Sequence, residues 1–354
     1  MDNIQKKKII IAMSGGIDSS VAAVILKKAG FEVTGVFMKF WREPGIQKWN
    51  KCCSPESEKR ARRVAMLLGI PFYVLNLEEE FKKIIVDYFL KEHKKGFTPN
   101  PCVVCNKEIK FSLLFKKAQK LEADYIATGH YAKIIKSNAD SKLLQGKDKE
   151  KDQSYFLWQL NQKQLRKILF PLGDFTKKEV RNLAKRYKLP VSDIPESQEI
   201  CFIQNTVGNF LKRHLKQKSG EIVDTKGKSV GRHQGLAFFT IGQRKGIGLA
   251  GGPYFVLGKD LKRNILLVTR KKRDLYKKEL VAKNINWISG RRPNLPLRVR
   301  TKIRYRSGPD LATIKPFCKR TLRVIFDKSQ KAITQGQSVV FYRKKELLGG
   351  GIIG

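Results

Sequence analysis

The sequence lacks any apolar run close to the roughly 18–20 residues that a membrane-spanning helix needs. It also lacks the apolar leader and small-residue cleavage site of a secretory signal, because a strand-like run follows MDNIQKKK directly. Cysteine is scarce, with six residues in 354, which argues against a disulfide framework. These absences predict a cytoplasmic protein with reduced thiols and no membrane partner.

Acidic side chains are also scarce, with 31 Asp and Glu against 73 Lys and Arg, so the formal net charge is +42. Residues 1–206 carry 38 basic and 23 acidic side chains, whereas residues 207–354 carry 35 and 8. A basic surface of this strength predicts a polyanionic partner, most commonly nucleic acid. A lysine bias throughout the proteome is the alternative, and the skew toward the C-terminal part argues against it.

A length of 354 residues predicts two or three domains, and 41% hydrophobic residues exclude a disordered or collagen-like chain. In the N-terminal part, strand-like runs alternate with helical patterns, which predicts an α/β fold with a doubly wound parallel sheet. The expected strands cover 8–13, 31–38, 72–77 and 124–128, and the expected helices cover 21–28, 56–68, 107–121 and 177–187.

Glycines and short β-like runs become frequent after residue 206, which predicts small β-rich domains, the last one a β-barrel. The expected strands cover 221–224, 236–240, 254–257, 265–269, 297–305, 322–326, 338–342 and 347–353. We therefore expect domains at 1–206, 207–278 and 279–354.

A glycine-rich string, Ser14-Gly-Gly-Ile-Asp-Ser19, lies between the first expected strand and helix. Two glycines let the backbone turn tightly, and the helix N-terminus that follows favours an anion such as phosphate. The string lacks the lysine of a Walker A loop and the G-x-G-x-x-G of a dinucleotide fold, so kinase and dehydrogenase readings are disfavoured. An ordinary βα turn is the alternative, and the complete S-G-G-x-D-S string argues against it.

Three cysteines are candidates for chemistry. Cys102 and Cys105 form a C-x-x-C, and Cys201 follows about a hundred residues later. Cys105 stands just before an expected helix, whose dipole would lower the pKa of its thiol. For Cys102 and Cys105, three explanations remain open: a redox pair, a metal site or a chance spacing. Cys201 taken alone is best explained as a small apolar residue of the core.

The glycine-rich string resembles the PP-loop of the ATP pyrophosphatase superfamily, whose members use ATP to adenylate an oxygen and release pyrophosphate. The resemblance implies that Ala12, Met13, Ser14, Gly15, Gly16, Ile17, Asp18 and Ser19 surround the phosphates of ATP. It places Asp18 near Mg²⁺, and it places Met38 and Gly129 at strand ends that frame the nucleotide.

A longer series of motifs narrows the resemblance: N-P-C-V-V-C-N-K-E-I-K-F, A-T-G-H-Y-A, K-D-Q-S-Y-F-L, S-Q-E-I-C-F-I, H-Q-G, T-I-G-Q-R-K-G, Y-R and G-Q-S-V-V-F-Y. In this order they make the chain similar, over essentially its whole length, to the tRNA-specific 2-thiouridylases of the MnmA type. The resemblance implies a monomeric, ATP-dependent transferase that replaces the C2 oxygen of a wobble uridine in a tRNA anticodon loop with sulfur. AMP and pyrophosphate are the by-products, and a separate protein donates persulfide sulfur.

The resemblance also assigns roles to the cysteines. Cys201 would carry the persulfide, and Cys105 would be the partner thiol that closes a Cys105–Cys201 disulfide at the end of each round. Many family members have Asp at the position of Cys102. Cys102, Cys105 and Cys201 are therefore also candidate ligands of a [4Fe–4S] cluster with one open iron, which is the main mechanistic alternative.

The remaining implied sites concern tRNA. Asn100, Pro101 and Cys102 would line the pocket for the target base. By the same resemblance, the residues in contact with tRNA would be His130, Lys151, Asp152, Gln153, Arg304, Tyr305 and Gln337. Residues 1–206 would form the ATP-binding catalytic domain, 207–278 a central β-rich domain, and 279–354 a tRNA-contacting barrel.

Three other classes of protein account for parts of this pattern. Another PP-loop ligase, such as a tRNA lysidine synthetase or an amidotransferase-type synthetase, has no use for the Cys105/Cys201 pair. A non-enzymatic RNA-binding protein does not need the S-G-G-x-D-S loop. A thiol oxidoreductase explains the C-x-x-C but leaves the basic β-rich domains unexplained.

Overall fold

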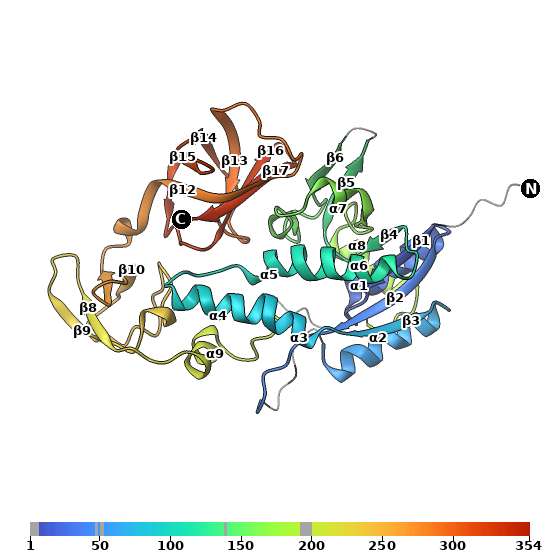
Figure 1. The fold of residues 1–354 in the computed structure, drawn as a ribbon, viewed down its shortest axis with the longest axis horizontal. Coiled ribbons are helices and arrows are strands. Elements are labelled where there is room, and N and C mark those ends of the chain that lie inside the picture. Colours follow the sequence, from blue (N-terminus) through green and yellow to red (C-terminus); the bar gives the residue numbers. More distant parts are fainter. Residues whose placement is uncertain (1–6, 47–48, 50–52, 138–139, 192–199) are drawn as a thin grey trace, which may run out of the picture.

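The computed structural model describes residues 7–46, 49, 53–137, 140–191 and 200–354. Within these residues an N-terminal α/β unit is followed by a small four-stranded sheet and a β-barrel (Figure 1). The predicted fold class is confirmed by this arrangement. In the described part of the chain, no helix is long and apolar enough to cross a membrane.

The α/β unit is built on a parallel sheet with the strand order β3-β2-β1-β4-β7. Its strands are β1 (Lys8–Ala12), β2 (Glu32–Lys39), β3 (Phe72–Asn76), β4 (Tyr125–Ala127) and β7 (Ile168–Leu169). Ile9 and Ile11 of β1 belong to one hydrophobic cluster and Ile10 to another. Because side chains alternate across a strand, this division shows that both faces of the sheet are covered, which explains the uninterrupted apolar run.

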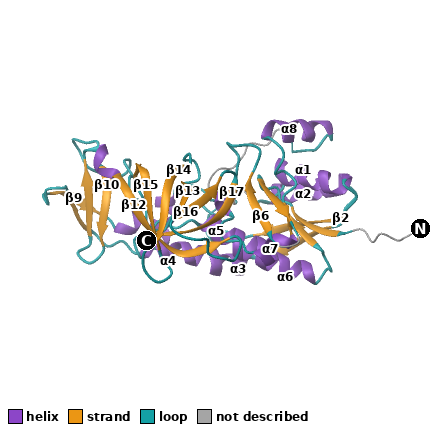
Figure 2. Cartoon of the chain, turned by 90° about the horizontal axis from the view of Figure 1, so that it is seen from above, coloured by secondary structure: helices purple, strands orange, loops and turns teal. Residues whose placement is uncertain are grey.

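Helices surround this sheet (Figure 2). They include α1 (Ile17–Lys28), α2 (Pro55–Leu67), α7 (Gln162–Lys167) and α8 (Lys177–Arg186). A helical run that the sequence analysis did not predict comprises α3 (Glu78–Phe81), η1 (Lys82–Val86) and α4 (Asp87–Lys94). It precedes the helix that carries Cys102 and Cys105.

The cysteine helix comprises α5 (Pro101–Val104), the π-helical segment η2 (Cys105–Leu113) and α6 (Leu114–Gln119). It begins six residues before the expected start at residue 107. A proline is well tolerated at a first helical position, because the N–H group that it lacks would have no partner in the helix. Both cysteines therefore lie inside the helix, and Cys105 does not precede it as expected.

The hairpin of β5 (Ala132–Lys136) and β6 (Ser141–Gln145) extends from the α/β unit to the barrel sheet. The barrel comprises β12 (Tyr276–Trp287), β13 (Leu297–Lys302), β14 (Asp310–Pro316), β15 (Leu322–Lys331), β16 (Ser338–Arg343) and β17 (Glu346–Ile353). Pairing of β12 with β17 closes the six strands, and β17 also pairs with β6. One sheet thus includes a hairpin from the α/β unit and the strands of the C-terminal barrel.

The central sheet has the order β10-β11-β8-β9 and follows α9 (Val207–His214). Its strands are β8 (Gly220–Val223), β9 (Ser229–His233), β10 (Phe255–Asp260) and β11 (Ile265–Thr269). The expected strand at 236–240 is wrong, because Leu236–Phe238 form a short 3₁₀ turn, η4. Its apolar residues fill the core of this unit, with Leu236 and Phe239 buried. Two further 3₁₀ turns are η3 (Ser154–Phe156) and η5 (Lys272–Leu275).

Trp158 joins the α/β unit to the barrel. Its side chain is fully buried, and its indole Nε1 donates a hydrogen bond to Ser338 Oγ at 3.0 Å. A Cβ atom added at Gly350 of β17 would lie 2.9 Å from the indole ring, so the barrel backbone rests directly on this side chain. The Asn286 amide also donates to the carbonyl of Trp158 at 2.7 Å.

Trp158→Ala should destabilise the protein by about 3–5 kcal/mol, because it removes a large buried ring and leaves a cavity between two units. Urea unfolding followed by circular dichroism measures the shift of the midpoint. Met66→Ala, at a side chain that is 74% exposed, should leave the midpoint nearly unchanged. Equal midpoints for the two variants would show that the indole does not hold the interface.

Candidate active site

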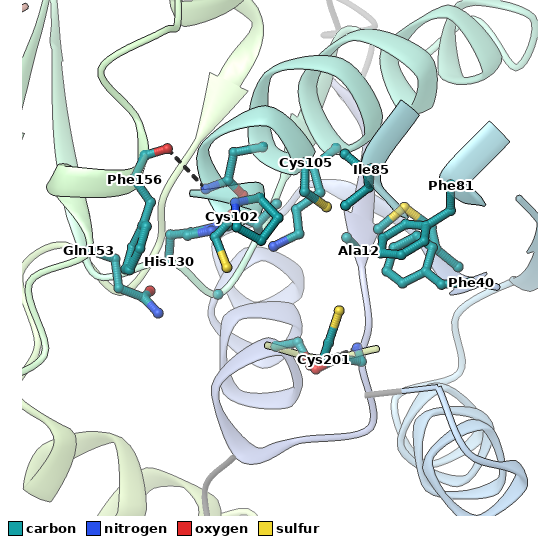
Figure 3. A pocket seen from close by; sticks show the side chains of 18 of the residues that line it. Ala12, Phe40, Phe81, Ile85, Cys102, Cys105, His130, Gln153, Phe156 and Cys201 are labelled. Carbon is teal, nitrogen blue, oxygen red and sulfur yellow. Dashed lines mark hydrogen bonds between the residues drawn. The ribbon is translucent and has the colours of Figure 1, made fainter. Parts of the chain in front are cut away.

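A cavity of about 340 Å³ lies at the carboxyl ends of β1, β2 and β4. In parallel α/β sheets this edge is where ligands bind. Its walls come from three segments: the loop after β1, the cysteine helix, and the loop around Cys201 (Figure 3). Its lining residues from these segments and the strand ends include Ala12, Met13, Ser14, Asp18, Ser19, Met38, Pro101, Cys102, Cys105, Asn106, Lys110, Thr128, Gly129, His130, Gln153 and Cys201.

The loop Ser14–Ser19 turns sharply into α1. Gly15 has a φ of +72°, and a Cβ atom there would lie 2.0 Å from the carbonyl oxygen of Ser57, so only glycine is compatible with this position. Ser19 Oγ accepts a hydrogen bond from the Ser14 amide at 3.1 Å. Gly16 precedes the first turn of α1, and Ile17 begins the helix as part of the core. The predicted phosphate loop thus has the geometry of a helix N-terminus that faces a cavity.

Gly129 allows β4 to approach this loop closely. A Cβ atom at Gly129 would lie 2.8 Å from both the carbonyl carbon of Asp18 and the amide nitrogen of Ser19. Met38, at the end of β2, lines the same cavity. Both residues therefore lie beside the loop, as their position at strand ends suggested.

The carboxylate of Asp18 is held by two residues that the sequence analysis missed. Its Oδ1 atom accepts one hydrogen bond from the hydroxyl of Tyr131 and another from Lys177 Nζ, each at 2.7 Å. Lys177 is a buried residue in the first turn of α8. A buried lysine that faces the phosphate loop supplies positive charge where an anion would bind. Its contact with Asp18 depends on the fold, so residue spacing did not reveal it.

The three candidate cysteines share one cavity, although a hundred residues separate the first two from the third. Figure 3 shows the side chain of Cys201 pointing across the cavity toward Cys102 and Cys105. Ser197–Glu199 of the motif around Cys201 lie outside the described residues, as does Cys52. The fold therefore brings the two distant thiols to the phosphate loop.

Burial dominates the electrostatics of the thiols. Desolvation raises the pKa of Cys105 to about 12 and that of Cys102 to about 11, although the charge of Lys110 lowers both. The expectation that a helix dipole would lower the pKa of Cys105 is therefore wrong, because the pKa is raised. Cys105 lies inside the helix and is only 7% exposed.

The three cysteines do not form a metal-ligand set. Over the described ranges, no group of three or more His, Cys, Asp and Glu side chains is arranged to hold a metal ion. The residues present thus do not match the ligand shell of the proposed [4Fe–4S] cluster, and we derive no step through it.

His130 is a neutral, buried side chain. Its Nδ1 atom lies 2.6 Å from Thr128 Oγ1, and burial holds its pKa well below the usual value. The cavity wall also includes Asn106, which is 3% exposed and donates to the carbonyl of Phe156 at 3.2 Å. Asn106 and Lys110 were not singled out from the sequence. Both residues belong to the N-P-C-V-V-C-N-K-E-I-K-F motif, and this membership could have marked them as candidate site residues.

The other residues expected to contact tRNA have varied surroundings. Asp152 is buried and accepts hydrogen bonds from Gln145, Gly146 and Ser154, so its carboxylate shapes the turn after β6. The neighbouring Gln153 lines the cavity, and Lys151 is half-buried.

In the barrel, Arg304 donates to the carbonyls of Lys331 and Ala332. The ring of Tyr305 packs on Phe156 with centroids 4.6 Å apart. Gln337 donates to the backbone that precedes the cysteine helix. Arg304 and Gln337 line another cavity together with Thr98 and Thr240.

A glycine-rich βα loop and a cavity with three cysteines define a nucleotide-binding α/β protein that carries two β-rich units. The sequence models of the families described as tRNA methyl transferase HUP domain, tRNA methyl transferase PRC-barrel domain and aminomethyltransferase beta-barrel domain match residues 7–205, 208–270 and 277–353.

Curated relatives named tRNA-specific 2-thiouridylase MnmA include those of Clostridioides difficile, 48% identical over 98% of both chains, and Carboxydothermus hydrogenoformans, 45% identical over 100% of this chain and 99% of that protein. The chain belongs to the tRNA-specific 2-thiouridylase (MnmA) family.

Solved structures give weaker likenesses. The match to an NMN synthetase from Francisella tularensis includes 55% of this chain and 68% of the synthetase. The two share 18% identity, and the TM-score is 0.35. A predicted subunit of tRNA methyltransferase from Methanocaldococcus jannaschii covers 59% and is itself covered over 87%, with 21% identity and a TM-score of 0.33. No inference rests on either likeness.

The thiols of Cys102 and Cys105 should react slowly with iodoacetamide at pH 7.5, because the thiolate is the nucleophile and both pKa values lie far above that pH. Labelling of Cys102 and Cys105 should rise about tenfold per pH unit up to pH 10, as the thiolate fraction does. Peptide mass spectrometry after timed labelling measures this rate, with the exposed Cys318 as the internal reference. Labelling of Cys105 at pH 7.5 as fast as that of Cys318 would contradict the effect of burial.

Proposed function

We propose that the chain is an ATP-dependent tRNA sulfurtransferase that converts the wobble uridine of tRNA to 2-thiouridine. Membership of the 2-thiouridylase family supports the reaction. The observation that carries the mechanism is that the phosphate loop, Cys105 and Cys201 line one cavity. Adenylation and sulfur transfer require such proximity, because the first step modifies the C2 oxygen of the base and the second step acts on the carbon that carries this oxygen.

The first step activates the base. The uridine C2 oxygen attacks the α-phosphorus of ATP, pyrophosphate leaves, and the oxygen becomes part of an AMP leaving group. The loop Ser14–Ser19 and the first turn of α1 offer backbone N–H groups to the phosphates, and Lys177 adds a positive charge nearby.

The site is compatible with a magnesium ion. Mg²⁺ bound to nucleotide phosphates usually takes one or two protein carboxylates, and Asp18 supplies one at the loop. When bound, the ion neutralises phosphate charge. Tyr131 and Lys177 fix the orientation of the Asp18 carboxylate.

The second step transfers sulfur. An external protein donor loads Cys201 as a persulfide, whose terminal sulfur attacks C2 and displaces AMP, so that a Cys201–S–S–C2 linkage forms. The Cys105 thiol then attacks the Cys201 sulfur and breaks its bond to the transferred sulfur. A Cys105–Cys201 disulfide forms, and the thiolated base leaves with the proton that Cys105 loses. An external dithiol reduces this disulfide before the next round.

The tRNA would lie across the α/β unit and the barrel, with the target base near Asn100, Pro101 and Cys102. Pro101 and Cys102 line the cavity. The excess of basic over acidic residues in 207–354 would neutralise backbone phosphates. Lys151, Gln153 and His130 lie close to the cavity or on the turn beside it, and Arg304 and Tyr305 lie on the facing side of the barrel.

Gly15→Ala should reduce tRNA-dependent pyrophosphate release at least tenfold, because the new Cβ would collide with Ser57 and the left-handed backbone would be strained. Gly208→Ala, in α9 and outside the phosphate loop, is the control, since the nearest atom to a Cβ there would be Thr206 Oγ1 at 4.0 Å. Pyrophosphate is measured with a coupled phosphate assay, and the melting temperature shows whether each variant folds. Equal rates of pyrophosphate release for the two variants would show that the reaction does not depend on the geometry of this loop.

Cys201→Ser should abolish 2-thiouridine formation, while the affinity for tRNA and the rate of pyrophosphate release in the first turnover stay within about twofold of the wild type. Serine cannot carry a sulfane sulfur, but it preserves the size of the side chain. Cys318→Ser, at an exposed thiol in the barrel, is the control and should retain activity. Liquid chromatography with mass spectrometry of digested tRNA quantifies the product. Thiolation by Cys201→Ser at the wild-type rate would refute the persulfide assignment.

A further inference from the structure

The segment 96–100 connects α4 to the cysteine helix, and we call it the strap. It contains no helix or strand, yet the central unit and the barrel bind its backbone at several points. A loop held in this way has little freedom, because each hydrogen bond fixes a backbone group that would otherwise bind water. The strap therefore sets where the cysteine helix begins.

The barrel turn 335–337 makes the largest set of these contacts. The Thr98 amide donates to the carbonyl of Gln335 at 2.9 Å. The Gln337 side chain returns to the strap, where its Nε2 atom donates to the carbonyls of Thr98 at 2.8 Å and Pro99 at 3.2 Å. One amide group thus holds two successive carbonyls of the strap.

Gly336 allows this close approach. Its φ is +89°, and a Cβ atom there would lie 2.9 Å from Phe97 Cβ and 3.0 Å from the Thr98 backbone. The barrel itself fixes the turn, because the Gly336 amide donates to the carbonyl of Ile353 and the Ile353 amide donates to the carbonyl of Gln337. The barrel therefore sets the position of Gln337, and Gln337 in turn holds the strap by hydrogen bonds.

The central unit holds the other side of the strap. Lys259 of β10 donates to the carbonyl of Gly96 at 2.8 Å, and the hydroxyls of Thr98 and Thr240 lie 3.1 Å apart. At its far end the strap reaches Asn100, which directly precedes the cysteine helix. The next two residues, Pro101 and Cys102, line the cavity.

We propose that Gln337 is a positioning residue that holds the strap so that Cys102 and Cys105 face Cys201 across the cavity. Resemblance to the family had implied a contact with tRNA for this residue, whereas its amide is directed to Thr98 and Pro99. The inference rests on the proposed function, because it assigns the cysteine helix to sulfur transfer. It also gives the barrel a second task, the alignment of the catalytic thiols.

Gln337→Leu tests this role, because it removes both amide donors without a change in charge. The affinity for tRNA should stay within about twofold of wild type, and the single-turnover rate of thiolation from a preloaded persulfide should fall at least tenfold. Gln337→Lys restores a long side chain with N–H donors and should regain most of that rate. Gln330→Leu, on β15 of the same barrel, is the matched control, because the amide of Gln330 donates to the carbonyl of Lys328 in its own strand.

A measurement without tRNA separates positioning from tRNA contact. Diamide should form the Cys105–Cys201 disulfide at least tenfold more slowly in Gln337→Leu than in wild type, as shown by mass spectrometry of peptides. If Gln337→Leu does not fold, Gln337→Glu provides the same test with a side chain of the same shape. An unchanged disulfide rate together with weakened tRNA binding would overturn the proposal and make Gln337 a tRNA contact.

The two hypotheses fail in different ways. A wild-type protein that makes no 2-thiouridine with tRNA, ATP and a persulfide donor would remove the proposed function. The disulfide rates of the wild type and the Gln337 variants would still show whether the strap aligns the thiols.

Discussion

Burial of the cysteine helix against the carboxyl edge of the parallel sheet is the constraint on which the rest of this structure depends. It places Cys105 beside the phosphate loop and also removes the thiol from water. Burial makes the thiolate form unfavourable, so Cys102 and Cys105 are mainly protonated near neutral pH. In the proposed mechanism, an apolar wall on one side and N–H donors on the other would also protect the adenylated base from hydrolysis.

The chain builds this cavity from segments that are far apart in sequence. The sheet leads into the phosphate loop, the cysteine helix supplies Cys102 and Cys105, and residues after 199 supply Cys201. The π-helical segment η2 begins at Cys105 itself, and such segments are frequent at functional sites. The barrel then holds the start of the cysteine helix through the strap, and β6 extends the barrel sheet into the α/β unit. Hydrogen bonds thus link the barrel, which carries part of the proposed tRNA-binding surface, to the strap that precedes the cysteine helix.

Local patterns in the sequence were enough to predict the parallel sheet and the phosphate loop, because buried strands and glycine turns leave signatures within a few residues. The approach of Cys201 to Cys105 left no such signature, and only the family resemblance implied it. Lys177 and Tyr131 were missed because their role is defined by contact with Asp18. The strand expected at 236–240 was wrong because apolar residues serve a buried turn as well as a strand. The helix dipole expected to activate Cys105 is outweighed by burial, which spacing alone does not reveal.

The central claim is that one sulfur atom moves from Cys201 to the base while Cys105 and Cys201 become oxidised. The most direct measurement is a single turnover of enzyme preloaded with one persulfide, in the presence of ATP and tRNA and without reductant. Rapid acid quench and mass spectrometry then quantify 2-thiouridine and the Cys105–Cys201 disulfide in the same samples. The account predicts that both appear at the same rate and in equal amounts. Formation of 2-thiouridine while Cys105 and Cys201 remain as thiols would contradict it.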